Sequence, residues 1–199
     1  MLLVVFGASG RTGRQVVAQA IERGHGVTAF VRGASRFDAP MAARVVEGDA
    51  RDPAAVEEAV RGAEAVISVL ALMSPDDEPQ HSDATRTIVE GAERLGVRRV
   101  VVTANNDVFG DREVMGEFAA HAREHRRNRT RLQASGLDWT IGAAPWVTDD
   151  PATGWYEAVV DAMAPGKRLP AGNFATFTLD ALERDEWIGH LVGVSQPPS

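Results

Sequence analysis

Three glycines near the start of the chain have the spacing of a phosphate-binding turn. Gly7, Gly10 and Gly13 form a G-x-x-G-x-x-G pattern between an apolar run and a helix-like run. Backbone N–H groups and the dipole at a helix start attract phosphate, and glycines allow its close approach. The first step is one residue longer than in the G-x-G-x-x-G fingerprint. The pattern predicts a dinucleotide site, with a purely structural turn as the alternative.

The end of the second predicted strand indicates which dinucleotide binds. An acid at this place holds the ribose 2′-OH of NAD, whereas arginine accommodates the 2′-phosphate of NADP. The strand ends in Val31-Arg32, Arg36 follows four residues later, and the first acid is Asp38. We expect NADP rather than NAD, and solvated surface arginines are the alternative.

Polar residues follow the fifth predicted strand, where sheets of this kind bind ligands. Asn105 can hydrogen-bond a carboxamide or a substrate carbonyl, but it cannot donate a proton as an acid. Asp107 is a candidate base, and turn chemistry is the alternative for both. After the sixth predicted strand, Trp146 offers a flat wall to an aromatic substrate or packs under the C-terminal segment.

Two histidines lie four residues apart in an arginine-rich helical run. His121 and His125 share a helix face, but a metal site needs a third ligand and shielding from water. Because five arginines surround them, we expect a solvated face and no metal. The run itself is Glu113–Ala134.

Alternating strand and helix patterns must position these residues. They predict an α/β fold, a single-domain Rossmann-like doubly wound parallel sheet flanked by helices, with its ligand crevice beyond the carboxyl ends of the strands. The expected strands are Leu2–Phe6, Val27–Val31, Val45–Val46, Ala65–Leu70, Val97–Thr103, Leu137–Ile141 and Ile188–Val194; the expected helices, besides the arginine-rich run, are Arg11–Arg23, Asp52–Val60, Asp83–Leu95 and Phe174–Leu182; Ser74–Gln80 reads as loop.

Composition excludes several classes of function. The 199 residues carry a net charge of -7, which disfavours nucleic acid as a partner. Cysteine is absent, so thiol chemistry and disulfides are excluded. The first apolar run is too short for a signal or a membrane span. We expect one cytoplasmic domain over residues 1–199, with a cofactor half at roughly 1–104 and substrate-side segments at roughly 105–195.

The proton-transfer pair of the short-chain dehydrogenases cannot form in this chain. Those enzymes use a tyrosine with a lysine four residues later. Tyr156 is the only tyrosine, Val160 stands four residues after it, and Lys167 is the only lysine.

Several segments in order resemble the NAD(P)H-binding, NmrA-like group of atypical short-chain dehydrogenases, nearest to the biliverdin-IX-beta reductase/flavin reductase type. The resemblance implies a usually monomeric Rossmann fold with NADPH. It also implies hydride transfer to flavins, quinone-like rings or tetrapyrroles, whose protons can come from solvent. The segments are GASGRTG at 7–13, RGASR at 32–36, EGD at 47–49, GVRRVVVT at 96–103, LQASGLDWTI at 132–141 and PATGWYEAVVD at 151–161.

Two positions depart from that group. Asn105 stands where the group usually has a serine close to the nicotinamide. In the group an arginine and two prolines commonly follow the sixth strand; here Gly142-Ala143-Ala144-Pro145 stands instead, and Trp146 occupies the site of a histidine in some reductases.

We therefore expect an NADPH-dependent oxidoreductase that passes hydride to a planar conjugated acceptor: a flavin, quinone, tetrapyrrole or aromatic polyketide-like molecule. A non-catalytic NmrA-like sensor or accessory protein, or a non-redox biosynthetic accessory enzyme, is the alternative. We expect a monomer or weak dimer without a membrane partner. The expected catalytic residues are Asn105, Asp107 and Trp146; the cofactor residues are Gly7, Ser9, Gly10, Arg11, Thr12, Gly13, Arg32, Arg36, Asp49, Ala50, Leu70, Ala71, Leu72, Ala104 and Asn105; the substrate pocket is Asn106, Phe109, Trp146, Trp155 and Tyr156.

Overall fold

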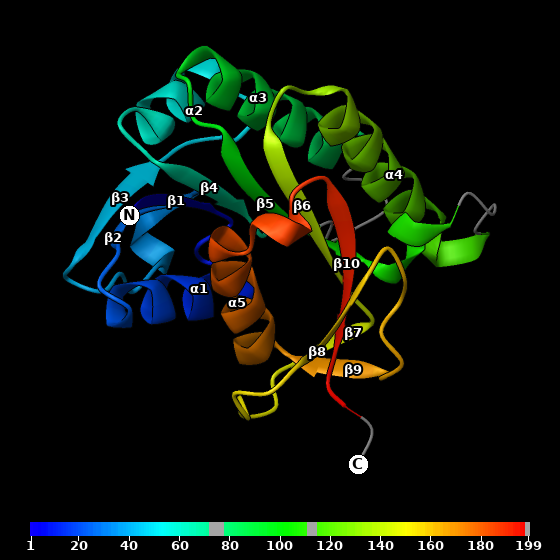
Figure 1. Ribbon diagram of the computed structural model, residues 1–199. Helices are drawn as coiled ribbons and strands as arrows, with labels where there is room; N and C mark the ends of the chain where they lie inside the picture. The colour runs from blue at the N-terminus through cyan, green and yellow to red at the C-terminus, as the bar shows by residue number, and fades with distance from the viewer. Residues whose placement is uncertain (72–77, 111–114, 198–199) are drawn as a thin grey trace.

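An eight-stranded sheet forms the centre of the protein in the computed structural model, which describes residues 1–71, 78–110 and 115–197. Neighbouring strands are parallel except at one edge, where β8 runs antiparallel to β10. The predicted α/β class and doubly wound parallel sheet are confirmed (Figure 1). The order is β3-β2-β1-β4-β5-β6-β10-β8, with β1 Leu2–Phe6, β2 Gly26–Val31, β3 Ala43–Glu47, β4 Ala65–Ser68, β5 Arg99–Asn105, β6 Asp138–Ala144, β8 Glu157–Val160 and β10 His190–Ser195.

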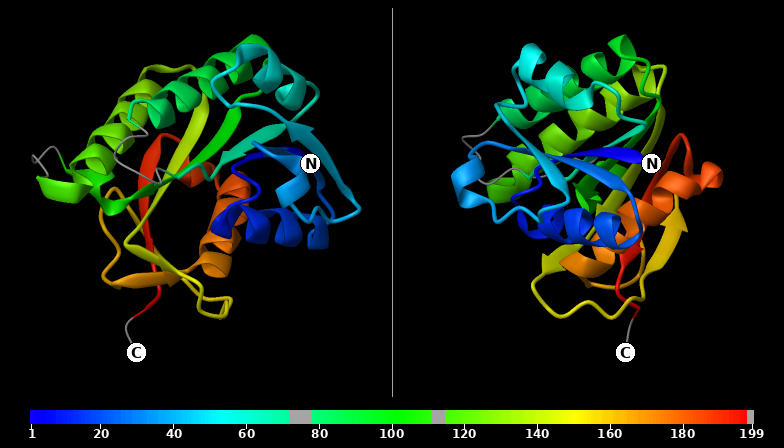
Figure 2. Two further views of the ribbon diagram at one scale, coloured as in Figure 1. Left: turned by 180° about the vertical axis from the view of Figure 1, so that it is seen from behind. Right: turned by 90° about the vertical axis from the view of Figure 1, so that its left-hand side faces the viewer.

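Helices cover both faces of the sheet (Figure 2). Side chains of a strand alternate between faces, so β1 sends Leu3 and Val5 into one buried cluster and Val4 and Phe6 into the other. A strand buried on both faces reads as an unbroken apolar run, as this one does. The first face carries α1 (Arg11–Glu22) and α5 (Ala171–Asp180); the second carries α2 (Pro53–Val60), α3 (Gln80–Arg94) and α4 (Ala119–Ala134).

The last helix returns to the first one. α5 packs along α1, and Gln19 of α1 donates a hydrogen bond to the carbonyl of Gly172 at 2.9 Å. Arg23 at the end of α1 pairs with Asp180 at 2.7 Å. The two ends of the chain therefore share one core on this face.

Several predicted boundaries shift by a few residues, among them that of α3, which begins at Gln80 inside the predicted loop, and two of the shifts have a local cause. The arginine-rich helix begins at Ala119 rather than Glu113, because Gly116 has a φ of +77° within the short 3-10 turn Gly116–Phe118 (η4). Residues 113–114 lie outside the described part. β6 continues past Ile141, where a Cβ at Gly142 would stand 2.2 Å from the ring of Phe177.

The segment after Pro145 contains strands that the sequence pattern did not predict. β7 (Trp146–Thr148) and β9 (Arg168–Pro170) form a separate parallel pair, and β8 closes the edge of the main sheet. Strands of three or four residues leave too little periodicity to detect. Within the described residues, no helix is long and apolar enough to cross a membrane.

Candidate functional site

The glycine loop between β1 and α1 is built by close backbone approaches. Gly7 has a φ of +81°, and a Cβ there would lie 2.9 Å from the carbonyl oxygen of Val69, the residue that follows β4. A Cβ at Gly13 would lie 2.1 Å from the carbonyl oxygen of Gly7. Gly7 is needed for the turn, and Gly13 lets the helix sit against the loop.

The start of α1 points free donors at the space beyond the strands. Gly10 is its N-cap residue and provides no side-chain cap. The first backbone N–H groups of a helix lack intrahelical partners, so an anion here meets donors and the positive end of the dipole. Arg11 turns away from this space: it donates to the carbonyl of Val147 at 2.6 Å and pairs with Asp149 at 2.9 Å.

A cavity of about 210 Å³ opens beside this loop. It lies at the carboxyl ends of β2, β3 and β4, where ligands bind in open parallel sheets. The start of α3 closes its other side. Eight predicted cofactor residues line it, namely Gly7, Ser9, Gly10, Arg32, Asp49, Ala50, Leu70 and Ala71; the other lining residues, which the sequence reasoning missed, are Phe30, Val31, Arg51, Val69, Gln80, His81 and Ala84.

One end of the cavity carries an excess of positive charge. Arg51 binds both carboxylate oxygens of Asp49, and its hydrogen bond holds the pKa of that carboxyl below its usual range. Arg32 lies exposed at the same cavity and adds a second guanidinium. Two arginines therefore face a single paired carboxylate, an arrangement that suits an additional phosphate.

A side chain of α3 contacts the segment that follows β4. The Nε2 of His81 lies 3.2 Å from the carbonyl oxygen of Leu70, and the Nδ1 faces the Nδ2 of Asn128 at 3.2 Å. If the ring donates through Nε2 and accepts at Nδ1, both contacts are satisfied by the neutral form. Leu72, predicted to contact the cofactor, and part of the predicted loop Ser74–Gln80 lie outside the described residues.

The predicted catalytic loop after β5 forms a short 3-10 turn, η3 (Asn106–Phe109). The Oδ1 of Asn105 accepts a hydrogen bond from the N–H of Asp107 at 3.0 Å, which is turn capping. The Oδ1 of Asn106 is buried without a partner among the described residues. Phe109 and Ala104 pack against the core on the α3 side. Catalytic roles for Asn105 and Asp107 stay predictions.

The aromatic residues predicted for the acceptor pocket separate into two kinds. Trp146 and Trp155 are 67% and 75% exposed. Tyr156 instead packs edge-on against Phe177, and its hydroxyl donates to Asp180 at 2.6 Å. Burial raises the pKa of Tyr156, and the bond to Asp180 adds to the shift. The two tryptophans remain open to a ligand, whereas the contacts of Tyr156 are those of a packing residue.

The expectation of a solvated histidine face on α4 is wrong for His125. Its side chain is 7% exposed and lies edge-on to His81, with ring centroids 5.3 Å apart. Burial, with His81 and His121 nearby, lowers the pKa of His125 to about 3. The prediction failed because the neighbouring arginines indicate a solvated helix by composition. In the structure Arg123 and Arg127 pair with Glu78 at 2.7 and 3.0 Å, and His125 is buried beside them.

The fold and the glycine-lined cavity define a Rossmann-type dinucleotide-binding protein. The family model described as NAD(P)H-binding matches residues 7–185, and the chain belongs to that NAD(P)H-binding family. The glycine loop fits such a cofactor because it is shaped by glycines whose side-chain positions are blocked by backbone atoms, at Gly7 and Gly13. Arg32 and Arg51 line the same cavity and supply positive charge for its phosphates.

Some of the similar proteins are named as redox enzymes. A 3-diazoavenalumate denitrifying reductase from a Streptomyces species is 40% identical over 113 residues, covering 51% of this chain and 36% of that protein. The chain thus matches about a third of that relative's length. Two solved structures share the fold: SP1627 of Streptococcus pneumoniae, provisionally assigned as an NADH-flavin reductase (21% identity, 99% and 100% of the chains, TM-score 0.84), and a Veillonella parvula short-chain dehydrogenase/reductase in complex with NADP (20%, 98% and 94%, 0.79).

Proposed function

We propose that this protein is an NADPH-dependent oxidoreductase that reduces a planar conjugated acceptor, such as a flavin, quinone, tetrapyrrole or aromatic polyketide-like molecule. The bound cofactor supplies a hydride. The chain binds and orients both partners, and this positioning is the main source of catalysis where no Tyr-x-x-x-Lys pair exists.

The observation that carries the cofactor proposal is the charge at the cavity. Arg32 and Arg51 both face it, and Asp49 is already paired with Arg51. An arginine here can bind a 2′-phosphate through charge-assisted hydrogen bonds, whereas a paired carboxylate is a poorer acceptor for a ribose hydroxyl. Together they favour NADP. Arg36 ends the neighbouring turn Ala34–Arg36, but its side chain lies outside the described part, so its predicted phosphate contact stays a prediction.

The acceptor proposal rests on the exposed rings of Trp146 and Trp155. Flat aromatic faces stack on conjugated rings. The relation to a named reductase and the fold shared with SP1627 support the same class. We further propose a monomer or weak dimer in the cytoplasm that acts on small molecules.

The test is a reduction assay with purified protein, NADPH or NADH, and a panel of FMN, FAD, naphthoquinones and biliverdin. We expect oxidation of NADPH with at least one acceptor and a lower kcat/KM with NADH. If NADPH binds tightly but none of the acceptors is reduced, the reductase proposal is wrong and the alternative, a non-catalytic NmrA-like sensor, is favoured. Equal affinity for both cofactors would contradict the role of Arg32 and Arg51.

A further inference from the structure

A polar cluster runs from the cavity wall into the interface between α3 and α4. His81 lines the cavity and contacts both Asn128 and the ring of His125. Asn128 is 2% exposed and His125 is 7% exposed. The cluster lies under the arginine-rich outer surface of α4 and joins it to the cavity.

The cluster contains buried atoms with unused hydrogen-bonding capacity. The Nδ1 of His125 and the Oδ1 of Asn128 are buried and have no hydrogen-bond partner in the described part of the protein. The Oδ1 of Asn106, on the turn η3 that packs against α4, is also buried without a hydrogen-bond partner among the described residues. Buried polar groups nearly always have partners, so three such atoms point to a bound molecule or water at this interface.

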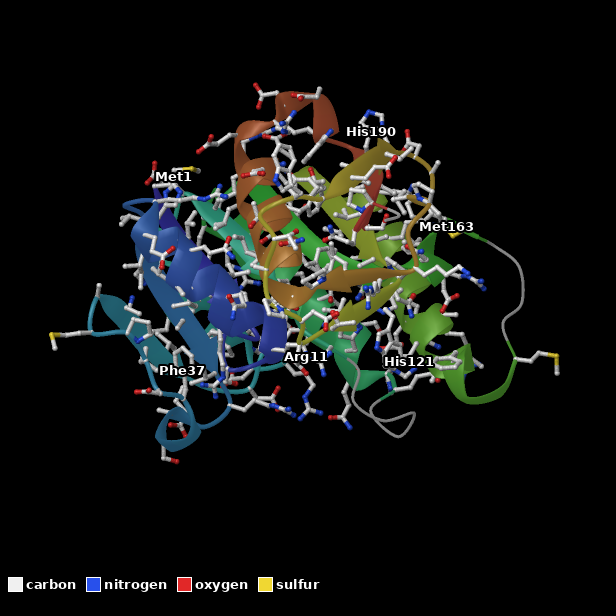
Figure 3. All side chains as sticks on the ribbon, turned by 90° about the horizontal axis from the view of Figure 1, so that it is seen from below. Met1, Arg11, Phe37, His121, Met163 and His190 are labelled. Atoms are coloured by element: carbon white, nitrogen blue, oxygen red, sulfur yellow. The ribbon has the colours of Figure 1, made fainter. Side chains whose placement is uncertain are left out.

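His121 lies at the outer end of this cluster. It stands one helical turn before His125, so both rings project from the same face of α4. α4 leads from the carboxyl end of β5 to the start of β6. Its first turns therefore lie at the carboxyl ends of the strands, the end of the sheet that carries the cavity. His121 is half-buried, and the ring of Phe118 lies 6.1 Å from its ring. In Figure 3, Arg11 at the start of α1 and His121 lie on the same side of the molecule.

We propose that His121 is the proton donor to the acceptor, a role that rests on the reductase function proposed above. The loop after β5 offers no better donor: Asn105, predicted to orient the ligand, cannot act as an acid, and its oxygen accepts from the N–H of Asp107 to cap η3. Imidazole is the side chain suited to proton transfer near neutral pH. The ring of Phe118 lies beside the imidazole of His121.

The neighbouring histidines have a different role. His125 stays neutral because burial lowers its pKa to about 3. His81 is engaged with Leu70 and Asn128. Both are positioning residues, and His121 is the one ring of the three that reaches the surface. The described ionisable groups packed against the first half of α4 include His81 of α3, which contacts His125, and Glu78, which pairs with Arg123 and Arg127.

The proposed step balances for a quinone. The acceptor gains a hydride from the dihydronicotinamide, which is oxidised, and the electron pair moves onto a quinone oxygen. The N–H bond of the protonated His121 breaks, an O–H bond forms on that oxygen, and water returns a proton to the imidazole. A flavin needs no such donor at neutral pH, because hydride at its N5 gives a stable anion.

The experiment compares His121→Gln with wild type on 1,4-naphthoquinone and on FMN. We expect kcat for the quinone to fall about 100-fold or more, with FMN reduction changed less than about threefold. His121→Ala should regain quinone activity when imidazole is added. His190→Gln is the matched control: His190 pairs with Asp161 at the amino end of β10, the end of the parallel strands away from the cavity, and its loss should leave both rates unchanged.

A second measurement needs no turnover. 1-Naphthol, a phenol that cannot be reduced, should shift the imidazole NMR signals of His121 and leave those of His190 in place. Equal quinone rates in His121→Gln and wild type, or no shift with 1-naphthol, overturns the role of His121 while leaving the reductase function intact. A wild type that reduces neither acceptor removes the proposed function and this role with it.

Discussion

The carboxylate of Glu124 on α4 accepts hydrogen bonds from both the backbone N–H and the hydroxyl of Ser82 on α3, at 2.7 and 3.1 Å. Glu124 is fully buried, and Arg127 also donates to it, at 2.6 Å. A side chain from one helix thereby caps the first turn of another. That turn carries Gln80 and His81, which line the cavity, so α4 holds one wall of the site.

Replacing Glu124 should destabilise the fold strongly. In Glu124→Ala the N–H of Ser82 is left buried without an acceptor, and we expect the free energy of unfolding to fall by about 3 kcal/mol. Urea denaturation measures the change. Glu58→Ala is the control: Glu58 pairs with Arg44 on the surface, and its loss should cost less than about 0.5 kcal/mol. Similar losses in both variants would contradict the capping role.

The glycine loop should reject a single methyl group at Gly13. A Cβ there meets the Gly7 oxygen at 2.1 Å and the Cα of Ala8 at 2.8 Å, so the helix must move away from the loop. We expect Gly13→Ala to weaken NADPH binding at least about tenfold and to destabilise the protein by about 2 kcal/mol. Gly33→Ala is the control, because no atom lies within 4 Å of its Cβ position. Fluorescence titration with NADPH measures both variants.

Cofactor preference should depend on Arg32 and Arg51. Each alanine variant should raise the Kd for NADPH about tenfold and leave the Kd for NADH nearly unchanged, since only NADPH carries the 2′-phosphate. Isothermal titration with both cofactors measures the ratio. Arg61→Ala, at the exposed end of α2, should change neither value. Equal weakening of both cofactors would place the two arginines at another part of the dinucleotide.

Tyr156 should contribute to stability and not to turnover. Tyr156→Phe removes the bond to Asp180, and we expect a loss of about 1 kcal/mol with unchanged kcat. The raised pKa of Tyr156 means that the folded state keeps a proton that the unfolded state releases, so its contribution is complete below pH ~10 and declines above it. The variant should therefore lose less stability at alkaline pH than wild type. If Tyr156→Phe lowers kcat tenfold without loss of stability, Tyr156 contributes to the acceptor pocket as the sequence predicted.

Acid should destabilise the protein partly through His125. Its pKa is about 3 when folded and about 6.5 when unfolded, so below pH ~6.5 the unfolded state binds a proton that the folded state refuses. Its contribution is complete above that pH and declines as the pH falls toward 3. Between pH 7 and 4.5, wild type should lose about 2 kcal/mol more than His125→Gln, as measured by urea denaturation at both pH values. Equal losses would show that the folded protein protonates His125 readily.

The sequence predicted those parts of the site that depend on local chain geometry. The glycine loop, Arg32 and Asp49 follow directly from strand ends and helix starts, and all reach the cavity. Arg51 was missed although it stands two residues after Asp49, and that spacing was the available signal. The predicted cofactor contact of Leu72 stays a prediction, because the structure does not describe that residue.

The histidine cluster was missed for a different reason. An arginine-dense helix has the composition of a solvated one, and the acids that neutralise Arg123 and Arg127 come from another segment. His81 reaches the cavity only because α3 packs on α4. One signal was present: His121, His125, Asn128 and Leu132 recur at the spacing of a single helix face, and three of them are buried.

The contact of α5 with α1 also governs when the protein can fold. Leu3 and Val5 of β1 share a buried cluster with Phe174 and Phe177, about 170 residues later in the chain. During synthesis one apolar face of β1 is therefore covered only in part, by α1, until α5 emerges. Folding of the dinucleotide half must wait until α5 has been synthesised, and a nascent chain stalled before α5 would expose a surface that chaperones bind.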